Sequence, residues 1–452
     1  MIESKTKKQN SVELNVNRYG TPEIKGLGFV RPFSNSEKLS MACTRNYTLE
    51  YIEEFKTDGV NENFAYGSCW HLLLERILLR IRETDVFPTN KEIHTILSSE
   101  LESVIEEVFT EYKTDRISTS DLVKLKKSIE ERICLSIDGW ANNWRTHIHP
   151  NFEIIDVEMV VYAPVSFNGD IFKSKIKVIK ETYPSDNKEY KNLNKYRLLR
   201  SGENNFAAEL PIDCISSELY EIEMPYYKIG KIDAVLLHRE YNSLWVLDHK
   251  TTKSPQMYEK KTEFDLQLTG YCALLRKQLR AGRFDHIKDR GNLFIGGVIW
   301  DLCSSDITTS KIPKPLKSGK FSQSASRCPP SWLFKKAIEE HNLKIESYAE
   351  FYKTCLDKDD RFFIIKEIFV SDSEMDRLDV EDYSTALRLD KIRKDIEEID
   401  WEVPNDWDLR SPRFTVCTNY SSCKFSTNCF ANSKANDIFL MRQQKLSWIE
   451  YE

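Results

Sequence analysis

The sequence contains no long apolar segment. None of its 452 residues belongs to a run approaching the roughly 20 apolar residues needed to cross a bilayer. Residues 1–15 also lack the apolar core of a signal peptide. These absences argue against a membrane partner and predict a protein that stays in the cytoplasm where it is made.

Disordered and fibrous character is absent as well. The chain is 40% hydrophobic and 12% aromatic, which is ordinary for a globular protein, and its length suffices for the cores of about two or three domains. A GxxxxGK[ST] nucleotide-binding loop does not occur. The chain therefore has no visible motor of its own.

An overall excess of positive charge is missing too, since the formal net charge is −6. The charge is nevertheless segregated: residues 173–200 hold nine Lys and Arg against three acidic residues, residues 311–336 hold seven and no acidic residue, and residues 372–408 are strongly acidic. Lysines interleaved with Tyr183 and Tyr190 suit a single nucleic-acid strand, because cations neutralise phosphates and aromatic rings stack on bases. A solvated surface would show the same charge run.

The number of cysteines is odd. Eleven cysteines without a secretory signal argue against a disulfide framework, and most lie in apolar runs as small core residues. Cys417, Cys423 and Cys429 differ, because five polar or turn-forming residues separate each from the next. Thiolates in such a segment favour Zn²⁺ or an iron–sulfur cluster, with a fourth ligand from elsewhere.

Residues 227–253 predict a β-hairpin, in which two apolar runs flank a polar turn at residues 238–243. Asp248 and Lys250 project to one side of the second strand, and the hairpin can bring Asp233 beside them. Buried carboxylates are costly unless they are paired or bind a metal, so the pattern indicates a Mg²⁺ or Mn²⁺ site. A surface Asp–Lys salt bridge is the alternative.

Two predicted helices flank this hairpin in sequence. Gln267 and Tyr271 lie one turn apart on a segment from about residue 263 to 280, and His71 and Glu75 lie one turn apart on residues 64–84. A histidine on an apolar helix is otherwise typical of a core residue.

Four ordered motifs, GSCWHLLLE, GKID, DHK and QLTGY, at residues 67–75, 230–233, 248–250 and 267–271, resemble the PD-(D/E)XK nuclease superfamily. They are most similar to its RecB-like branch, which includes CRISPR-associated and phage-type iron–sulfur exonucleases. The resemblance implies an α/β fold with a restriction-endonuclease-like core, in which helices flank a central mixed sheet, together with a helical insertion and iron–sulfur-stapled termini.

The segment MACTRNYTLEYI resembles the Cys-x-Arg-x-Tyr opening of these nucleases. The resemblance implies that Cys43 joins Cys417, Cys423 and Cys429 as ligands of a 4Fe-4S cluster, with Zn²⁺ as the alternative. A buried thiol on an apolar helix face is the other reading of Cys43.

The resemblance also implies roles for the hairpin residues. His71, Asp233, Asp248 and the carbonyl of His249 would hold Mg²⁺ or Mn²⁺, and Lys250 would orient water or stabilise the transition state. The helices would add Gln267 and Tyr271, which would contact DNA or hold Lys250, and Glu75, which would orient His71. Glu158 is either an extra carboxylate or a solvent-facing residue.

The predicted function is therefore a metal-dependent DNA exonuclease on single strands or DNA ends, acting in recombination, repair or phage and mobile-element DNA processing. The alternatives are a structure-selective endonuclease and a non-catalytic DNA-binding scaffold. A helicase, recombinase or single-strand-binding protein would be a separate partner, and a phage-encoded chain would work in the host cytoplasm.

The expected organisation follows the motifs along the chain. It comprises a poorly ordered or extended segment (1–33), a helical region with the first cysteine and the histidine motif (34–152), a nuclease core (153–310) with a basic insertion (164–222), a region of basic loop, helices and late strand (311–410), and a cysteine-cluster segment (411–452). Further expected elements are strands at 153–163, 293–300 and 361–371, two amphipathic helices within 90–146, a helix over 332–357 and an acidic helix over 373–399.

Overall fold

The computed structural model describes residues 14–16, 22–24, 28–29, 31–41, 55–57, 61–110, 118–182, 195–198, 216–262, 265–324, 328–397 and 440–442. The chain forms two compact units. The first unit gathers Met1–Asp58, Tyr162–Gly230 and Asp376–Glu452, and the second unit gathers Gly59–Val161 and Lys231–Met375. None of the described helices is long and apolar enough to cross a membrane.

The second unit is built on a mixed β-sheet. Strand β12 (Ser243–Thr252) pairs antiparallel with the end of β11 (Ser216–His238) and parallel with β13 (Phe294–Ser304). Strand β14 (Phe363–Phe369) pairs antiparallel with β13, and β6 (Phe152–Pro164) pairs with β11. The hairpin and the three further strands expected from the sequence are thus confirmed.

The parallel pair β12 and β13 needs a crossover, since two parallel neighbours cannot be joined by a tight turn. The crossover contains α6 (Pro255–Thr262), α7 (Leu266–Arg280) and the 3₁₀ turn η2 (Asp285–Arg290). Both α6 and α7 pack against β12 and β13. Asp265 begins α7, because its side chain accepts a hydrogen bond from the Gln267 amide at 2.8 Å.

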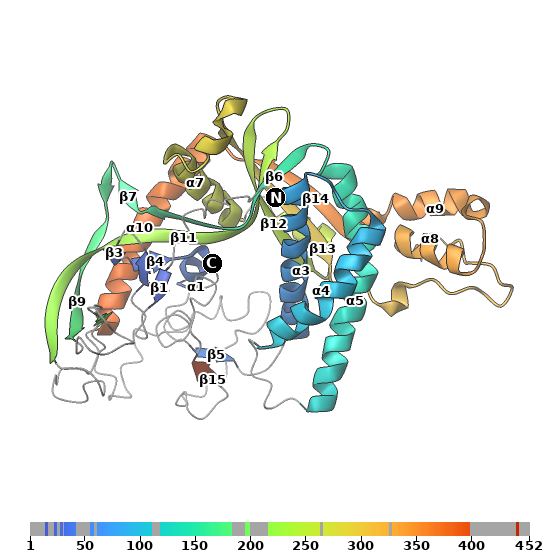
Figure 1. Ribbon diagram of the computed structural model, residues 1–452, viewed down its shortest axis with the longest axis horizontal. Coiled ribbons are helices and arrows are strands. Elements are labelled where there is room, and N and C mark those ends of the chain that lie inside the picture. Colours follow the sequence, from blue (N-terminus) through green and yellow to red (C-terminus); the bar gives the residue numbers. More distant parts are fainter. Residues whose placement is uncertain are drawn as a thin grey trace, which may run out of the picture. The chain divides into compact units, whose positions relative to one another are not determined.

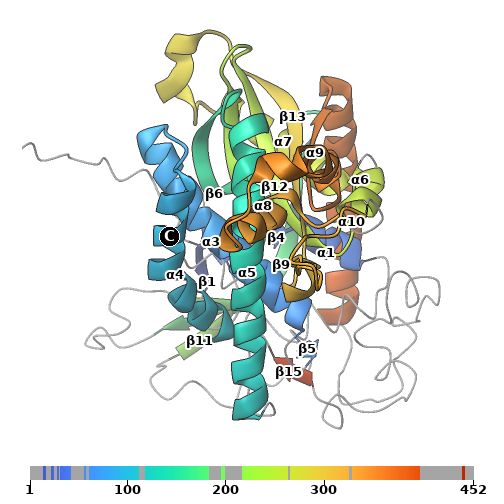
Figure 2. The same ribbon diagram turned by 90° about the vertical axis from the view of Figure 1, so that its right-hand side faces the viewer.

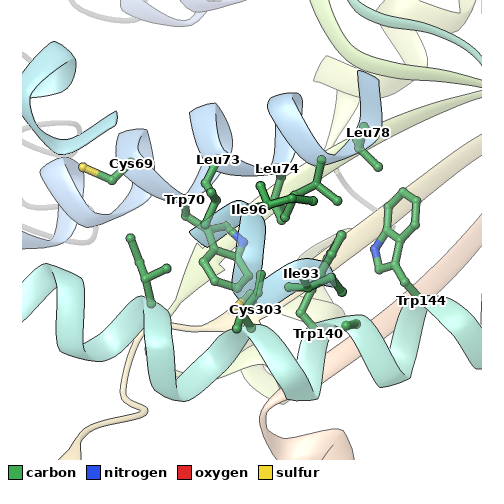
Figure 3. Packing of buried hydrophobic residues seen from close by; sticks show 14 of the residues in the cluster. Cys69, Trp70, Leu73, Leu74, Leu78, Ile93, Ile96, Trp140, Trp144 and Cys303 are labelled. Atoms are coloured by element: carbon green, nitrogen blue, oxygen red, sulfur yellow. The ribbon is translucent and has the colours of Figure 1, made fainter. Parts of the chain in front are cut away.

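Three helices form the main hydrophobic core with one face of this sheet. They are α3 (Glu62–Thr84), α4 (Asn90–Thr110) and α5 (Thr119–His147), which lie side by side in Figures 1 and 2. Figure 3 shows Trp140 and Trp144 of α5 among apolar side chains of α3 and α4. Trp245 and Leu247 supply the sheet side of this core. The two helices expected within residues 90–146 are confirmed, and their apolar faces are buried in the core.

The segment expected to be one helix over residues 332–357 is instead two helices. Helix α8 (Ser331–Glu340) ends because Asn342 adopts a left-handed conformation with φ 53°, and the Leu343 amide bonds back to the Ile338 carbonyl. A 3₁₀ turn η5 (Ile345–Tyr348) then leads into α9 (Ala349–Leu356). These elements, which lie together in Figure 1, bury a small core of their own around Phe334 and Phe351.

The basic segment preceding α8 is irregular, as its Pro, Gly and Ser content predicts. After the short 3₁₀ turn η3 (Thr309–Lys311), no helix or strand occurs among the described residues up to Ser331. The short 3₁₀ turn η6 (Asp359–Arg361) precedes β14.

The first unit contains the long first half of β11, paired antiparallel with β9 (Lys173–Thr182) over Lys173 to Thr182. Strand β10 (Lys195–Leu198) pairs with β9, β4 (Arg31–Phe33) pairs parallel with β11, and β7 (Ser166–Phe167) pairs with β8 (Asp170–Ile171). The basic insertion is therefore largely strand where it is described.

Helix α10 (Asp372–Glu397) confirms the expected acidic helix and packs against the first unit's strands. Its Asp382 forms a buried ion pair with Lys228 at 2.6 Å, and Asp390 receives a hydrogen bond from Tyr226 at 3.3 Å. Phe33 and Leu389 share the apolar part of this packing.

The remaining described elements of the first unit are short. Strands β1 (Leu14–Val16), β2 (Pro22–Ile24) and β3 (Gly28–Phe29) form a small sheet, and β5 (Phe55–Thr57) pairs with β15 (Leu440–Arg442). The helix expected from Ser34 begins as α1 (Asn35–Ser40), with the Ser34 hydroxyl accepting from the Glu37 amide. Its continuation through Cys43 lies outside the described residues.

Candidate active site

The two aspartates of the hairpin meet where its strands run outward from the turn. The register pairs Leu237 with Leu244 and Ala234 with Leu247, so Asp233 and Asp248 are the next residues on their strands. Both approach one another closely enough for the Asp233 charge to raise the pKa of Asp248. The hairpin thus places two carboxylates side by side, as the sequence predicts.

Helix α3 brings His71 to the same point. Its Gly67 lies close to β12, where a methyl group would come 3.0 Å from Thr251 Oγ1, tighter than an ordinary van der Waals contact. One turn later, His71 Nδ1 lies 3.2 Å from Asp233 Oδ2. The His71 side chain keeps 34% of its surface exposed, so the site opens to solvent on this side.

Asp233 is held as a carboxylate. Burial alone would raise its pKa, but the charge and hydrogen bond of His71 and the hydrogen bond from the His249 backbone amide, at 2.8 Å, lower it to about 2. Both partners bond to the same oxygen, Oδ2.

Asp248 behaves in the opposite way. Burial and then the negative charge of Asp233 raise its pKa to about 7, against the opposing charge of Lys250. Two buried carboxylates without a cation between them repel one another, and one responds by keeping its proton. An added divalent ion would relieve this repulsion.

His71 is biased toward its protonated form. Burial lowers its pKa, but the charge and hydrogen bond of Asp233, with further contributions from Asp248 and Glu158, outweigh burial and raise the pKa to about 9. The imidazolium therefore supplies positive charge to the carboxylates.

Lys250 follows Asp248 on the same face of β12. Among the described residues no carboxylate forms an ion pair with its ammonium. Burial lowers its pKa, yet the charges of Asp248, Tyr258 and Asp265 raise it overall. Lys250 thus stays charged beside Asp248.

Glu158 of β6 lies near Asp233 of the site. It adopts φ 53° within β6, an unusual conformation for a residue in a strand, and its carboxylate pairs with Lys231 of the GKID motif. Burial and the nearby Asp233 charge raise the pKa of Glu158. The Glu158 side chain is only 19% exposed, so it does not face open solvent, and its role as an extra carboxylate of the site stays a prediction.

Glu75 forms no hydrogen bond or ion pair with His71 in the described part of the chain. It approaches Glu158 and Lys231 instead, and burial followed by the Glu158 charge raises its pKa. His71 Nδ1 donates its hydrogen bond to Asp233 rather than to Glu75.

The QLTGY motif lies on the first turns of α7. Gln267 Nε2 donates to Tyr271 Oη at 3.2 Å, which confirms that the two side chains share one face. Burial raises the pKa of Tyr271, and the charges of Asp248 and Asp233 raise it further, so its hydroxyl lies near the carboxylates.

His249 forms hydrogen bonds through both its backbone amide and its side chain, with different partners. The amide donates to Asp233, whereas the buried imidazole points into the core and bonds Asp301 Oδ2 through Nδ1 at 2.7 Å. Sequence reasoning considered only the carbonyl of this residue. Asp301 was not considered, although a lone acid within the apolar run FIGGVIWDLCS was the available signal.

The donor set fits a hard divalent ion. Carboxylate oxygens and one imidazole are the ligands that Mg²⁺ and Mn²⁺ accept. Among the described side chains, no three His, Cys, Asp or Glu groups already converge as a complete ligand set. His71 and Asp248 would have to give up protons and turn toward the ion.

The expected cluster ligands Cys43, Cys417, Cys423 and Cys429 lie outside the described residues. The cysteines that are described form no disulfide with one another: Cys69, Cys134, Cys272, Cys303, Cys328 and Cys355.

A comparison with curated proteins gives no match for this chain. A comparison with protein families gives one, described as the PD-(D/E)XK nuclease superfamily, over residues 36–295. This match covers more than half of the sequence and includes all four motifs, and the mixed sheet with its flanking helices is consistent with that fold. The chain belongs to the PD-(D/E)XK nuclease superfamily.

Proposed function

We propose that this chain is a Mg²⁺- or Mn²⁺-dependent exonuclease acting on single-stranded DNA or DNA ends. Superfamily membership implies metal-dependent hydrolysis of nucleic-acid phosphodiesters. The exonuclease activity is more specific than this and is the part that we propose. The observation that carries the proposal is the meeting of Asp233, Asp248 and His71, with Lys250 on the same strand face as Asp248.

The metal ligands would be Asp233, Asp248 and His71, with the carbonyl of His249. A divalent ion bound there supplies charge neutralisation at the scissile phosphate and a more acidic water. The chain's own contribution is to hold two carboxylates in one buried place and to keep an imidazole within 3.2 Å of Asp233.

Lys250 would act on the phosphate itself. Its ammonium stays charged next to Asp248, where it can orient the attacking water or stabilise the negative charge that develops in the transition state. Gln267 and Tyr271, bonded to one another on α7, would contact the DNA or limit the movement of Lys250.

Substrate would be drawn by the basic segments. Lys314, Lys317 and Lys320 are exposed on the irregular segment before α8, and Lys173 and Lys175 are exposed at the start of β9. Exposed cations of this kind neutralise backbone phosphates without reading sequence.

The test compares wild type with Asp248→Asn and Lys250→Ala on end-labelled single strands in Mn²⁺. Each variant should lose cleavage by about 100-fold or more, since groups that stabilise transition-state charge contribute on this scale. Lys253→Ala, an exposed lysine three residues further on, is the matched control and should cleave normally. Near wild-type cleavage by both site variants would overturn the assignment.

A circular single strand separates the alternatives. An exonuclease leaves it intact, whereas a structure-selective or restriction-like endonuclease cuts it. Binding of DNA without cleavage of either substrate would make the protein a non-catalytic scaffold.

We further propose that the chain falls in the RecB-like branch that carries an iron–sulfur cluster. The support is the sequence alone: the Cys43 motif before the nuclease core and Cys417, Cys423 and Cys429 after it. The setting would be recombination, repair, or phage or mobile-element DNA processing, with any helicase, recombinase or single-strand-binding protein a separate partner.

A further inference from the structure

A buried polar cluster lies behind the hairpin, on the face opposite Asp248 and Lys250. At its centre is Asp301 of β13, which is 1% exposed. Its Oδ2 accepts hydrogen bonds from Trp140 Nε1 at 2.8 Å, from Trp144 Nε1 at 2.6 Å and from His249 Nδ1 at 2.7 Å. A single carboxylate oxygen thus ties two residues of α5 to one residue of β12.

The imidazole of His249 is fixed from several directions. It stacks on Trp144 with ring centroids 5.8 Å apart, and its other neighbour is the ring of His71, edge-on at 5.9 Å. With the bond to Asp301, these contacts leave the ring little room to change rotamer.

Residue 249 is also the link between the core and the site. Its amide donates to Asp233 Oδ2, and its neighbours in the chain are Asp248 and Lys250. The register of β12 and β13 places His249 opposite Asp301. A displacement of the His249 backbone would therefore move the groups that hold the metal and the phosphate.

Stability alone does not explain this cluster. Apolar residues of similar volume often replace buried polar groups without loss of stability. Here His249 Nε2 and Asp301 Oδ1 remain buried without a hydrogen-bond partner among the described residues, which adds to the cost. This cluster costs folding free energy and lies directly behind the strand that carries Asp248 and Lys250. Its presence is therefore better explained by a role in positioning the backbone of that strand.

We propose that Asp301 is a positioning residue of the nuclease site, which through its hydrogen bond to His249 holds the backbone between Asp248 and Lys250 in the geometry that binds a divalent ion. This inference rests on the proposed function. It assigns to Asp301 no contact with metal or substrate.

The test measures Mn²⁺ affinity in the absence of DNA, from the electron paramagnetic resonance signal of free Mn²⁺. Asp301→Ala removes the acceptor and should weaken Mn²⁺ binding by about 10–100-fold, the usual effect of losing a partner that orients a metal ligand. Asp301→Asn keeps an oxygen for the three donors and should bind Mn²⁺ nearly as wild type does.

A control must separate positioning from general destabilisation. Ile299→Ala removes a fully buried side chain two residues earlier on the same face of β13. It should lower Tm but leave Mn²⁺ affinity close to wild type, because the Asp301–His249 bond is untouched. If Asp301→Ala fails to fold, His249→Phe replaces it, since this variant keeps a ring beside Trp144 but loses the bond to Asp301.

Each result is decisive. Three results would overturn the positioning role while leaving the nuclease proposal standing. The first is an unchanged Mn²⁺ affinity in Asp301→Ala or His249→Phe. The others are an equal loss of affinity in Asp301→Asn and Asp301→Ala, or an equal loss in Ile299→Ala. A wild-type protein that binds no Mn²⁺ would overturn the proposed function itself.

Discussion

Two side chains at the site hold protons that a divalent ion would displace. His71, with a pKa of about 9, is protonated near neutral pH, and Asp248, with a pKa of about 7, is half protonated there. Metal binding requires the neutral imidazole and the carboxylate. Both groups must therefore be deprotonated when the ion binds.

Mn²⁺ affinity should consequently rise with pH. Between about pH 6 and pH 9 the free protein loses the Asp248 proton first and the His71 proton second, so the competition that protons offer to the metal diminishes along this range. Mn²⁺ titrations at several pH values, with proton release followed by a dilute indicator dye, measure this directly. A pH-independent affinity with no proton release would contradict it.

At the residue scale, sequence reasoning found the side chains whose positions follow from strand alternation and helix periodicity. Asp233, Asp248 and His71 come together as expected, although their metal-binding roles stay a prediction. The left-handed conformation of Glu158 could not be foreseen, because glutamate rarely adopts it. Nor could the Trp140 contact with Asp301, since the two lie 161 residues apart.

At the scale of elements, α5 depends on a close approach at Gly139. A methyl group there would lie 2.4 Å from a ring carbon of Phe363 and 2.7 Å from one of Trp332. Neither aromatic ring is free to move, because both are packed in the main core. The glycine is thus required by space rather than by backbone conformation.

Gly139→Ala should therefore destabilise the protein despite the better helix propensity of alanine. Overpacking a core costs about 1–3 kcal/mol, which exceeds the roughly 1 kcal/mol that alanine gains over glycine in a helix. Urea unfolding should show a lower midpoint than wild type. Glu131→Ala, on the exposed side of the same helix, serves as the control, and an equal or higher midpoint for Gly139→Ala would refute the packing argument.

Periodicity located most elements and failed in two instructive places. The left-handed conformation of the single residue Asn342 separates α8 from α9 inside an otherwise helical sequence pattern. In residues 173–178, KSKIKV, lysines alternate with Ser174, Ile176 and Val178, as in a strand with one charged face. The prediction for these residues rests on their basic charge alone, although the alternation indicates a strand.

At the scale of the whole molecule, the first unit gathers three separate stretches of chain and the second unit gathers two. Such interleaving cannot be read from local patterns, because it depends on contacts between residues hundreds of positions apart. The domain boundaries expected from the sequence remain a prediction.

Charge segregation leads to a prediction about salt. Neutralising several lysines within residues 173–200 or 311–336 should flatten the slope of log affinity against log salt by about one unit per lost phosphate contact. Fluorescence anisotropy of a labelled single strand at several salt concentrations measures this slope. Unchanged slopes for both sets of variants would show that these segments are ordinary solvated surface and do not bind phosphates.

Cys43 lies more than 370 residues from Cys417 in the sequence, and only a shared metal would couple them. Cys43→Ser should expel a cluster that has four thiolate ligands, since structural metal binding is linked to folding. The variant should lose its visible absorbance, its stability and its nuclease activity together, with the nuclease motifs unchanged.

The measurement is iron and zinc content with the melting temperature, on protein purified without oxygen. Cys134→Ser, a described free thiol, is the control and should keep its metal and its stability. Stoichiometric zinc without iron would replace the cluster with a structural zinc. If Cys43→Ser retained full metal content and melted like wild type, Cys43 would be only a thiol, and Cys417, Cys423 and Cys429 would have to take their fourth ligand from elsewhere.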